Sequence, residues 1–202
     1  MMRLLSLSRL VAILTGYSLW SVVACGQPVR FTNQTEVGLL SGSGALIRQI
    51  GFTLQAFNGV RLNEFAELGA TVGLDAYPEV KLLPLAFGWR GVVPAGNVSP
   101  FLGLDVGYGF DWLERETDTD WYGGGLLFNP SVGIRIQSKG TDRFILSLGY
   151  KRQHYSAYTG QLLPEGVTPL PQTDPSLPPG MASLRKDAHT LQRMSVRLGL
   201  MF

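Results

Sequence analysis

Apolar and polar residues alternate along most of this chain. The clearest example is LQRMSVRLGLMF, at residues 191–202. The large apolar residues of this segment are Met194, Val196, Leu198, Leu200 and Phe202. The positions between them are held by Arg193, Ser195, Arg197 and Gly199. A repeat of two is the side-chain period of a β-strand, so a strand with one apolar and one polar face is predicted here.

Seven earlier segments alternate in a similar way. The predicted strands are residues 32–40, 48–58, 65–76, 80–93, 99–112, 126–137, 143–155 and 191–202. Each has about the ten residues that a tilted membrane-crossing strand needs. Pro84 lies within the fourth segment and removes one ladder donor, so a bulge or weak pairing is expected there. The pattern predicts an all-β fold of eight antiparallel strands.

The connections between these segments are unequal in length. Most are short turns, but residues 113–125 and the Pro-rich residues 156–190 are predicted to be long loops. With an even number of strands, both long loops fall at the end opposite to the two termini. Membrane barrels have short periplasmic turns and longer outer loops. We therefore expect both termini on the periplasmic side and the long loops outside.

Alternation alone does not separate a membrane barrel from a soluble lipocalin-like small-molecule carrier. Most of the segments place about four large apolar side chains on one face, and the interior of an eight-stranded barrel is too narrow to hold so many. The apolar face is therefore predicted to point outward, toward lipid, in an up-and-down transmembrane β-barrel whose closure satisfies the backbone hydrogen bonds.

The opposite face is rich in small residues and carries both signs of charge. Charges survive burial in a narrow lumen when they are paired, so these residues are predicted to line it as ion pairs. The predicted lumen charges are Glu36, Glu67, Asp75, Asp105, Arg90, Arg135, Lys151, Arg193 and Arg197. Expected pairs are Arg135 with Asp105 or Glu67, and the two arginines of the last strand with Glu36.

Composition supports one domain of unusual character. The chain has 202 residues, of which only 16% are charged, and 25 are glycine. Its mean hydropathy of +0.13 is too low for a helical membrane protein but suits an alternating barrel. The net charge of +2 does not argue for nucleic acid, and a single cysteine excludes an intrachain disulfide.

The N-terminus has the composition of an export signal. Arg3 and Arg9 precede an apolar run at residues 10–24, too short to span a membrane. Small residues favour cleavage after Gly26, which divides the chain into a signal peptide, 1–26, and a barrel, 27–202. The alternative is that Val22-Val23-Ala24-Cys25 is a lipobox, which would make Cys25 a lipid attachment site.

Several segments resemble a known family. They are LLPLAFGWRGVV, SPFLGLDVGYGF, NPSVGIRIQ and ILSLGYKRQ. These are similar to the small outer-membrane β-barrel proteins of Bacteroidetes-type bacteria, and the resemblance covers nearly all of residues 27–202. It implies a Gram-negative outer-membrane location, surroundings of outer-membrane lipid and lipopolysaccharide, and the barrel-insertion machinery as an assembly partner. The segment that ends at Phe202 resembles the assembly signal which that machinery reads.

The resemblance says little about activity. We expect a monomer without cofactor, metal or nucleic-acid partner, and a structural or surface-interaction role. Aromatic residues near segment ends are interpreted as headgroup-layer anchors, although aromatics are also common in strands. These residues are Trp89, Tyr108, Trp112, Trp121, Tyr122, Tyr150 and Tyr155.

The sharpest catalytic candidate is the pair His154 and Ser156. Its spacing is similar to the His and Ser of the outer-membrane lipid A deacylases, in which His would activate Ser as a nucleophile. Ala157 stands where that family usually has Asn, and the available acids, Glu165 and Asp187, lie in the predicted loop. A lipid A-modifying hydrolase is therefore carried as an alternative function.

A second candidate is an acidic run in the first long loop. Its members are Glu114, Glu116, Asp118 and Asp120. Carboxylates at alternate positions are ligands for a divalent cation, but the run lacks the Gly and the terminal Glu of a calcium loop. A solvated loop tip is the favoured interpretation.

Overall fold

The strands of this chain form a closed ring. The computed structural model describes residues 30–43, 48–138, 142–163 and 180–202. The strands are β1 (Arg30–Ser43), β2 (Arg48–Arg61), β3 (Ala66–Ala76), β4 (Lys81–Val92), β5 (Val98–Phe110), β6 (Asp120–Gly123), β7 (Gly125–Gln137), β8 (Arg143–Leu162) and β9 (Met181–Met201). The predicted signal peptide, residues 1–26, and Cys25 within it lie outside the described residues.

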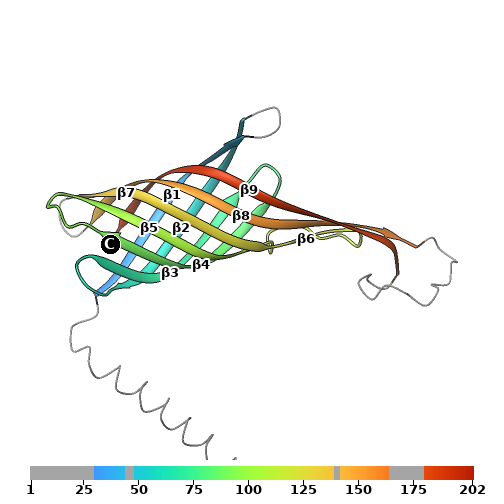
Figure 1. Ribbon diagram of the computed structural model, residues 1–202, viewed down its shortest axis with the longest axis horizontal. Coiled ribbons are helices and arrows are strands. Elements are labelled where there is room, and N and C mark those ends of the chain that lie inside the picture. Colours follow the sequence, from blue (N-terminus) through green and yellow to red (C-terminus); the bar gives the residue numbers. More distant parts are fainter. Residues whose placement is uncertain (1–29, 44–47, 139–141, 164–179) are drawn as a thin grey trace, which may run out of the picture. The chain divides into compact units, whose positions relative to one another are not determined.

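Each of the eight long strands pairs with its neighbours in the sequence, and the last closes onto the first (Figure 1). β9 pairs antiparallel with β8 on one side and with β1 on the other, where the register runs from Gln34 opposite Met201 to Ser41 opposite Met194. The predicted eight-stranded, antiparallel, up-and-down barrel is therefore confirmed. Closure leaves the barrel wall without the unpaired edge that an open sheet presents.

The apolar residues of the wall point outward. On β9, Met194, Val196 and Leu198 are 57%, 53% and 61% exposed, whereas the intervening Ser195 and Arg197 are each 1% exposed. β4 has the same alternation, with burial at every second position. The distribution of side chains is therefore inverted relative to that of a water-soluble protein, because the apolar side chains are outside and the polar side chains are inside.

Pro84 interrupts the ladder without shifting it. The β3–β4 register runs to Val72 opposite Leu85 and resumes at Asp75 opposite Leu82, with the same offset on both sides of the gap. Pro84 keeps its place opposite Gly109 on β5. The predicted weak pairing is present on the β3 side, but a bulge is not, because the missing donor opens the ladder without adding a residue.

The two ends of the barrel differ. The short-link end has the connections 62–65, 93–97 and 138–142, and the long-link end has those after β1, β3, β5 and β8. At the long-link end the strands run further than predicted. β8 continues to Leu162 and β9 begins at Met181, and both pass the ends of the other strands with β6 beside β8 (Figure 1).

These strands correct the predicted loop boundaries. Within the segment 113–125, Asp120–Gly123 is the strand β6, and within 156–190 the described residues pair as a β-hairpin, with residues 164–179 outside the described ranges. The prediction depended on alternating hydrophobicity, and residues 181–190 are mostly exposed on both faces. A strand that is solvated on both sides carries no such alternation.

Apolar side chains close the interior at each end. The cluster at the long-link end is Leu40, Tyr77, Val80, Leu82, Tyr155 and Leu191, with Tyr122 packed against it. The cluster at the short-link end is Val92, Phe101, Ile145 and Met201. Tyr155 and Tyr122 therefore belong to the interior rather than to a headgroup layer, whereas Tyr108 is exposed on the outer wall and Trp112 is exposed in the link after β5. In the described part of the chain, no helix has the length and apolarity needed to cross a membrane.

Candidate functional site

The charged interior of the barrel is the most elaborate polar arrangement in the described structure. All nine predicted lumen charges are buried, with exposures of 5% or less. They come from β1, β3, β4, β5, β7, β8 and β9, so their side chains meet only because the ring is closed. Several of their partners lie on strands that are not neighbours in the sheet, and such pairs cross the interior.

Arg135 on β7 and Glu67 on β3 form a bidentate pair across the barrel. The Nη1 and Nη2 atoms of Arg135 donate to the two carboxylate oxygens of Glu67 at 3.0 and 2.8 Å. Arg61 also approaches Glu67, at 3.2 Å, and the Arg135 guanidinium lies 5.0 Å from the Phe101 ring centroid. Of the two expected partners of Arg135, the structure places Glu67 against it, in the geometry that makes such pairs strong.

Asp105 on β5 pairs instead with Arg90 on β4. The Nη1 atom of Arg90 lies 2.8 Å from Oδ1 of Asp105, which also accepts a hydrogen bond from the Thr71 hydroxyl at 2.7 Å. The Asn129 amide donates to the other carboxylate oxygen at 3.0 Å. The Arg90 guanidinium also stacks 4.5 Å from the centroid of Phe57, an inward-facing aromatic residue. Asp105 is thus held by side chains from three strands: β4 and β7, which are adjacent to β5, and β3, which is not.

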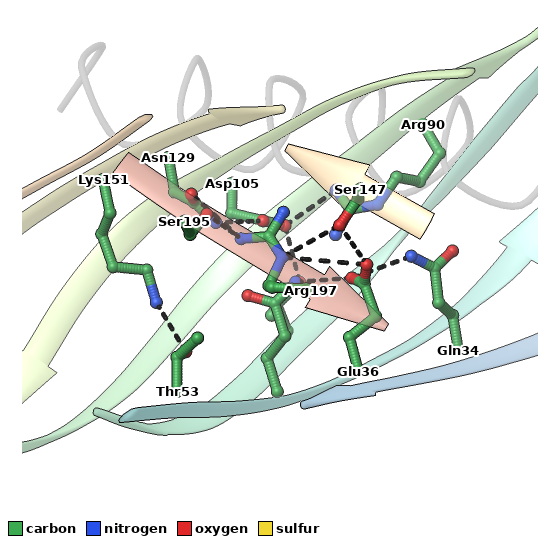
Figure 2. Close-up of polar contacts among 12 residues, drawn as sticks. Gln34, Glu36, Thr53, Arg90, Asp105, Asn129, Ser147, Lys151, Ser195 and Arg197 are labelled. Carbon is green, nitrogen blue, oxygen red and sulfur yellow. Dashed lines mark hydrogen bonds and ion pairs between the residues drawn. The ribbon is translucent and has the colours of Figure 1, made fainter. Parts of the chain in front are cut away.

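Glu36 on β1 and Arg197 on β9 join the first and last strands (Figure 2). Their closest charged atoms are 3.7 Å apart, and Ser147 bridges them by donating to Glu36 and accepting from Nε of Arg197. The amides of Gln34 and Gln55 donate to the second oxygen of Glu36 at 3.0 and 2.8 Å. The strand seam at which the ring closes is therefore also bridged by a polar network inside.

Lys151 on β8 reaches across to Asp75 on β3. Its ammonium group is 2.8 Å from both carboxylate oxygens, and the Thr53 hydroxyl donates to Asp75 at 2.6 Å. The phenol of Tyr77, in the link after β3, donates to the same carboxylate at 3.4 Å. Burial and the neighbouring charge of Asp75 raise the pKa of Tyr77 well above its ordinary value, so this phenol stays a neutral donor.

Arg193 differs from the other buried bases because its acidic partner is partly exposed. Its Nη2 atom donates to Gln49 at 2.6 Å and to Glu79 at 3.4 Å, and the Glu79 side chain is 31% exposed. The expected pairing of Arg193 with Glu36 is not made, since Glu36 is already held by Arg197 and three hydrogen-bond donors. Arg193 lies nearer the long-link end.

The interior charges are nearly balanced, and their bulk fills the lumen. Among the described residues, five bases and four acids are buried, a difference of one, and the fifth base is Arg193 with its partner Glu79. Glycines make room for the long side chains: a Cβ at Gly149 would lie 2.7 Å from Ser195 and 3.2 Å from the Arg197 guanidinium. This packing is what a narrow eight-stranded barrel permits.

The alternation of the sequence places uncharged residues on the polar face, but their role as partners of the charges was not predicted. Buried polar side chains that hold the charges include Gln34, Thr53, Gln55, Thr71, Asn129, Ser147 and Ser195. For Gln34, Thr71, Asn129, Ser147 and Ser195 the signal was present, because each shares the odd or even numbering of a lumen charge on its strand. β2 carries none of those charges, and there the signal is that Thr53 and Gln55 alternate with apolar residues. The charge that each of these residues contacts depends on packing across the barrel, and a local sequence pattern does not contain this information.

The structure does not assemble His154 and Ser156 into a catalytic arrangement. His154 Nδ1 is hydrogen bonded to the Thr190 hydroxyl at 2.9 Å. The two residues follow one another on the same face of β8, a spacing of roughly 6–7 Å along a strand. Asp187 lies opposite Ala157, on the other face of the sheet, and pairs with Arg185 at 2.9 Å. Glu165 lies outside the described residues.

Two members of the acidic run before β6 accept hydrogen bonds from neighbouring protein groups. Glu114 accepts a hydrogen bond from the backbone of Lys81 at 2.5 Å, and Asp120 accepts one from the Thr119 hydroxyl at 2.8 Å. Within the described ranges, no group of three or more His, Cys, Asp or Glu residues is placed to hold a metal ion.

Comparison with known proteins finds similarity at the level of the fold. No family model and no curated protein matches this chain. Among solved structures, it is similar to the crystal structure of Neisserial surface protein A. The two share 13% sequence identity with a TM-score of 0.49, over 87% of this chain and 98% of the other. The resemblance to the Bacteroidetes-type family stays a prediction.

Proposed function

We propose that this protein is an integral outer-membrane β-barrel with a structural or surface-interaction role. The observation that carries the proposal is the inverted distribution of side chains around a closed ring. The exposed large apolar side chains come from all eight long strands; examples are Leu39, Phe52, Val72, Phe87, Val106, Val132, Leu148 and Val196. Exposing so much apolar surface to water is highly unfavourable, whereas hydrocarbon accepts it.

The height of this apolar surface suits a bilayer. On β7 the outward apolar residues run from Leu126 to Ile136. Ten residues at about 3.3 Å each, tilted by about 40°, give a band of roughly 25 Å. That is close to the apolar band of outer-membrane barrels. The closed backbone ladder leaves no strand edge within this band, as a hydrocarbon surrounding requires.

The proposed orientation follows from the connections. The short-link end, which also carries the start of β1 and the end of β9, faces the periplasm, and the long-link end faces outside. The signal peptide proposed from residues 1–26 supplies the export that this location needs. The membrane neighbours in this proposal are outer-membrane lipid and lipopolysaccharide, and the insertion machinery would read the segment from Met194 to Phe202.

The filled interior argues against two other roles. A conducting pore needs open cross-section, and a soluble carrier needs an apolar cavity. The largest fully buried side chains here include Arg90, Arg135, Arg197 and Lys151, each in an ion pair. Such a centre is better interpreted as a plug that stabilises the barrel than as a channel or a ligand-binding cavity.

The surface-interaction part of the proposal falls on the extension, defined here as β6 with residues 156–162 and 181–190 of β8 and β9. Trp121 and Tyr158 stack across strands with centroids 5.4 Å apart, and Lys186 lies 5.3 Å from the Tyr158 ring. Trp and Tyr are enriched in protein–protein interfaces. The extension therefore offers a surface with stacked aromatic rings to a partner.

The architecture is tested by fractionation and heat-modifiable migration. The wild-type protein should be recovered in outer membranes and should migrate on a gel as a compact species unless boiled. Recovery in the soluble fraction without heat modifiability would overturn the proposal. For the hydrolase alternative, lipid A from cells expressing the wild type, His154→Ala and Ser156→Ala is compared by mass spectrometry; identical lipid A in all three and in the empty-vector strain supports the non-enzymatic role.

A further inference from the structure

The outer wall carries a groove near the long-link end, where β5, β7 and β8 lie side by side. Its lining residues are Val106, Leu126, Leu127, Phe128, Arg152 and His154, and its volume is about 310 Å³. Four of these residues are apolar. The other two, both on β8, place a cation and an imidazole at one side of an otherwise apolar surface. We call this feature the Arg152 groove.

Arg152 lies where the apolar wall stops. Before Arg152, the outward residues of β8 are Phe144, Leu146, Leu148 and Tyr150. Counted from the short-link end, Arg152 is therefore the first charged residue on the outward face of this strand. Its two cross-strand neighbours are Phe128 on β7 and Gln192 on β9. Phe128 is one outward position inside Leu126, where the apolar band of β7 ends, so in the proposed membrane orientation Arg152 lies close to the boundary between hydrocarbon and headgroups.

In the described ranges of the chain, no carboxylate neutralises the charge of Arg152. Among the described residues it has no ion pair, whereas the buried arginines 90, 135, 193 and 197 each contact a carboxylate. His154 is held through Nδ1 by the Thr190 hydroxyl at 2.9 Å, which leaves Nε2 as its other hydrogen-bonding atom. The groove thus has an apolar floor and an unneutralised cation at its polar side.

We infer that the Arg152 groove binds a phosphate-bearing lipid of the monolayer around the long-link end. An acyl chain lies against Val106, Leu126 and Phe128, and the phosphate accepts hydrogen bonds from the Arg152 guanidinium, whose planar fork matches a phosphate. A free anion would gain nothing from the apolar floor, and a neutral lipid would gain nothing from the cation. This inference rests on the proposed function, in which the lipid is that of lipopolysaccharide.

The inference is tested with the full chain purified in a neutral maltoside detergent. The probes are diphosphorylated lipid A and its fully dephosphorylated form, titrated by native mass spectrometry. The variant Arg152→Gln removes the charge and keeps the hydrogen-bonding length. The control, Arg185→Gln, removes an equally basic residue that is 78% exposed on the extension. The variant Phe128→Ser tests the apolar floor.

For diphosphorylated lipid A, Arg152→Gln should raise the dissociation constant about tenfold, the loss expected for a charge-assisted contact. Arg185→Gln should leave it within about twofold, and the dephosphorylated lipid should bind the wild type about as weakly as the phosphorylated lipid binds Arg152→Gln. Phe128→Ser should weaken both lipids alike. Equal affinities for Arg152→Gln and Arg185→Gln overturn the inference. If Arg152→Gln still inserts and migrates heat-modifiably, that result leaves the proposed function intact.

Discussion

The same two strands, β8 and β9, build two regions with different physical character. Between Arg143 and Tyr155, β8 alternates strictly between buried and exposed positions, and β9 does so from Leu191 onward. In the extension, residues 156–162 and 181–190 have little such alternation. Yet one ladder runs through both regions, from Arg143 opposite Met201 to Gln161 opposite Ser183. Backbone pairing is therefore shared, and only the surroundings of the side chains change.

This difference indicates what determines the register of strand pairing in each region. A slip of one residue in the barrel would bring Arg197 to the apolar outer wall and turn Leu198 inward, so the register there is strongly specified. In the extension, a slip exchanges one solvated face for another. The ring contact of Trp121 with Tyr158, at 5.4 Å between centroids, holds it instead, and the pair of Tyr155 and His189, at 5.0 Å, lies where the extension begins. The register irregularity in this ladder lies in the extension, between Gln161 and Leu162.

The largest effect is expected where the barrel region is broken from inside. Glu67→Gln removes the carboxylate that holds Arg135 and leaves a buried charge without its counter-ion. The free energy of unfolding should fall by about 3–5 kcal/mol, as measured by urea unfolding in lipid vesicles. Glu64→Gln, at an exposed acid in the adjacent link, is the matched control and should change it by less than about 0.5 kcal/mol. Equal losses in the two variants would contradict the pairing.

The comparison is sharpened by placing one new charge in each region. Leu148→Arg puts a cation on the outward face of the barrel, in the middle of the apolar band, and should cost about 2–4 kcal/mol in vesicles. Ala188→Arg does the same on the exposed face of the extension and should cost less than about 0.5 kcal/mol. Vesicle unfolding measures both. A barrel that tolerates arginine equally at the two sites would not be facing lipid at Leu148.

A smaller and local effect is expected from the extension's own contacts. Trp121→Ala removes the stack against Tyr158, a contact of about 0.5–1.5 kcal/mol. Amide hydrogen exchange should accelerate about two- to tenfold in residues 156–162, while residues 143–153 keep their protection. Acceleration spread evenly over both parts of β8 would show that the two regions open as one unit.

The smallest effect on the barrel should follow from removing most of the extension. Replacing residues 158–186 by an Asn-Gly turn retains the pairs up to Ala157 opposite Asp187. Because the polar network and both apolar clusters lie elsewhere, heat-modifiable migration and the unfolding midpoint should stay unchanged. A large drop in the midpoint would mean that the extension supports the ring.

The barrel could be predicted from the sequence because its two faces impose a local pattern on each strand. Alternation such as that of Met194, Val196 and Leu198 arises where a strand has an apolar outer face and a filled polar lumen on its other side. Seven of the eight long strands therefore begin within two residues of their predicted starts, and the exception is β9, whose first part lies in the extension. β6 and the outer part of β8 lack those environments, and their pairing was not predicted for that reason.

The charged interior also has one property that the sequence predicts and one that it does not. That Glu67, Asp105 and Arg135 share the polar face is a local property, and the sequence displays it. Whether Arg135 meets Glu67 or Asp105 depends on tilt and stagger around the ring, which no local pattern contains. The choice of Glu79 rather than Glu36 for Arg193 has the same origin, since it is set by the height of each residue along the barrel.

The most direct test of the inverted barrel is a spin-label scan along β7. Single cysteines replace residues 126–136 in a Cys25→Ser background, and oxygen and nickel-chelate accessibilities are measured by electron paramagnetic resonance in lipid bilayers. Oxygen accessibility should peak at Phe128, Val132 and Ile134 and fall at Asn129, Ser131 and Arg135. Peaks at the odd-numbered positions, or nickel accessibility equal at all of them, would contradict a lipid-facing apolar wall around a charged interior.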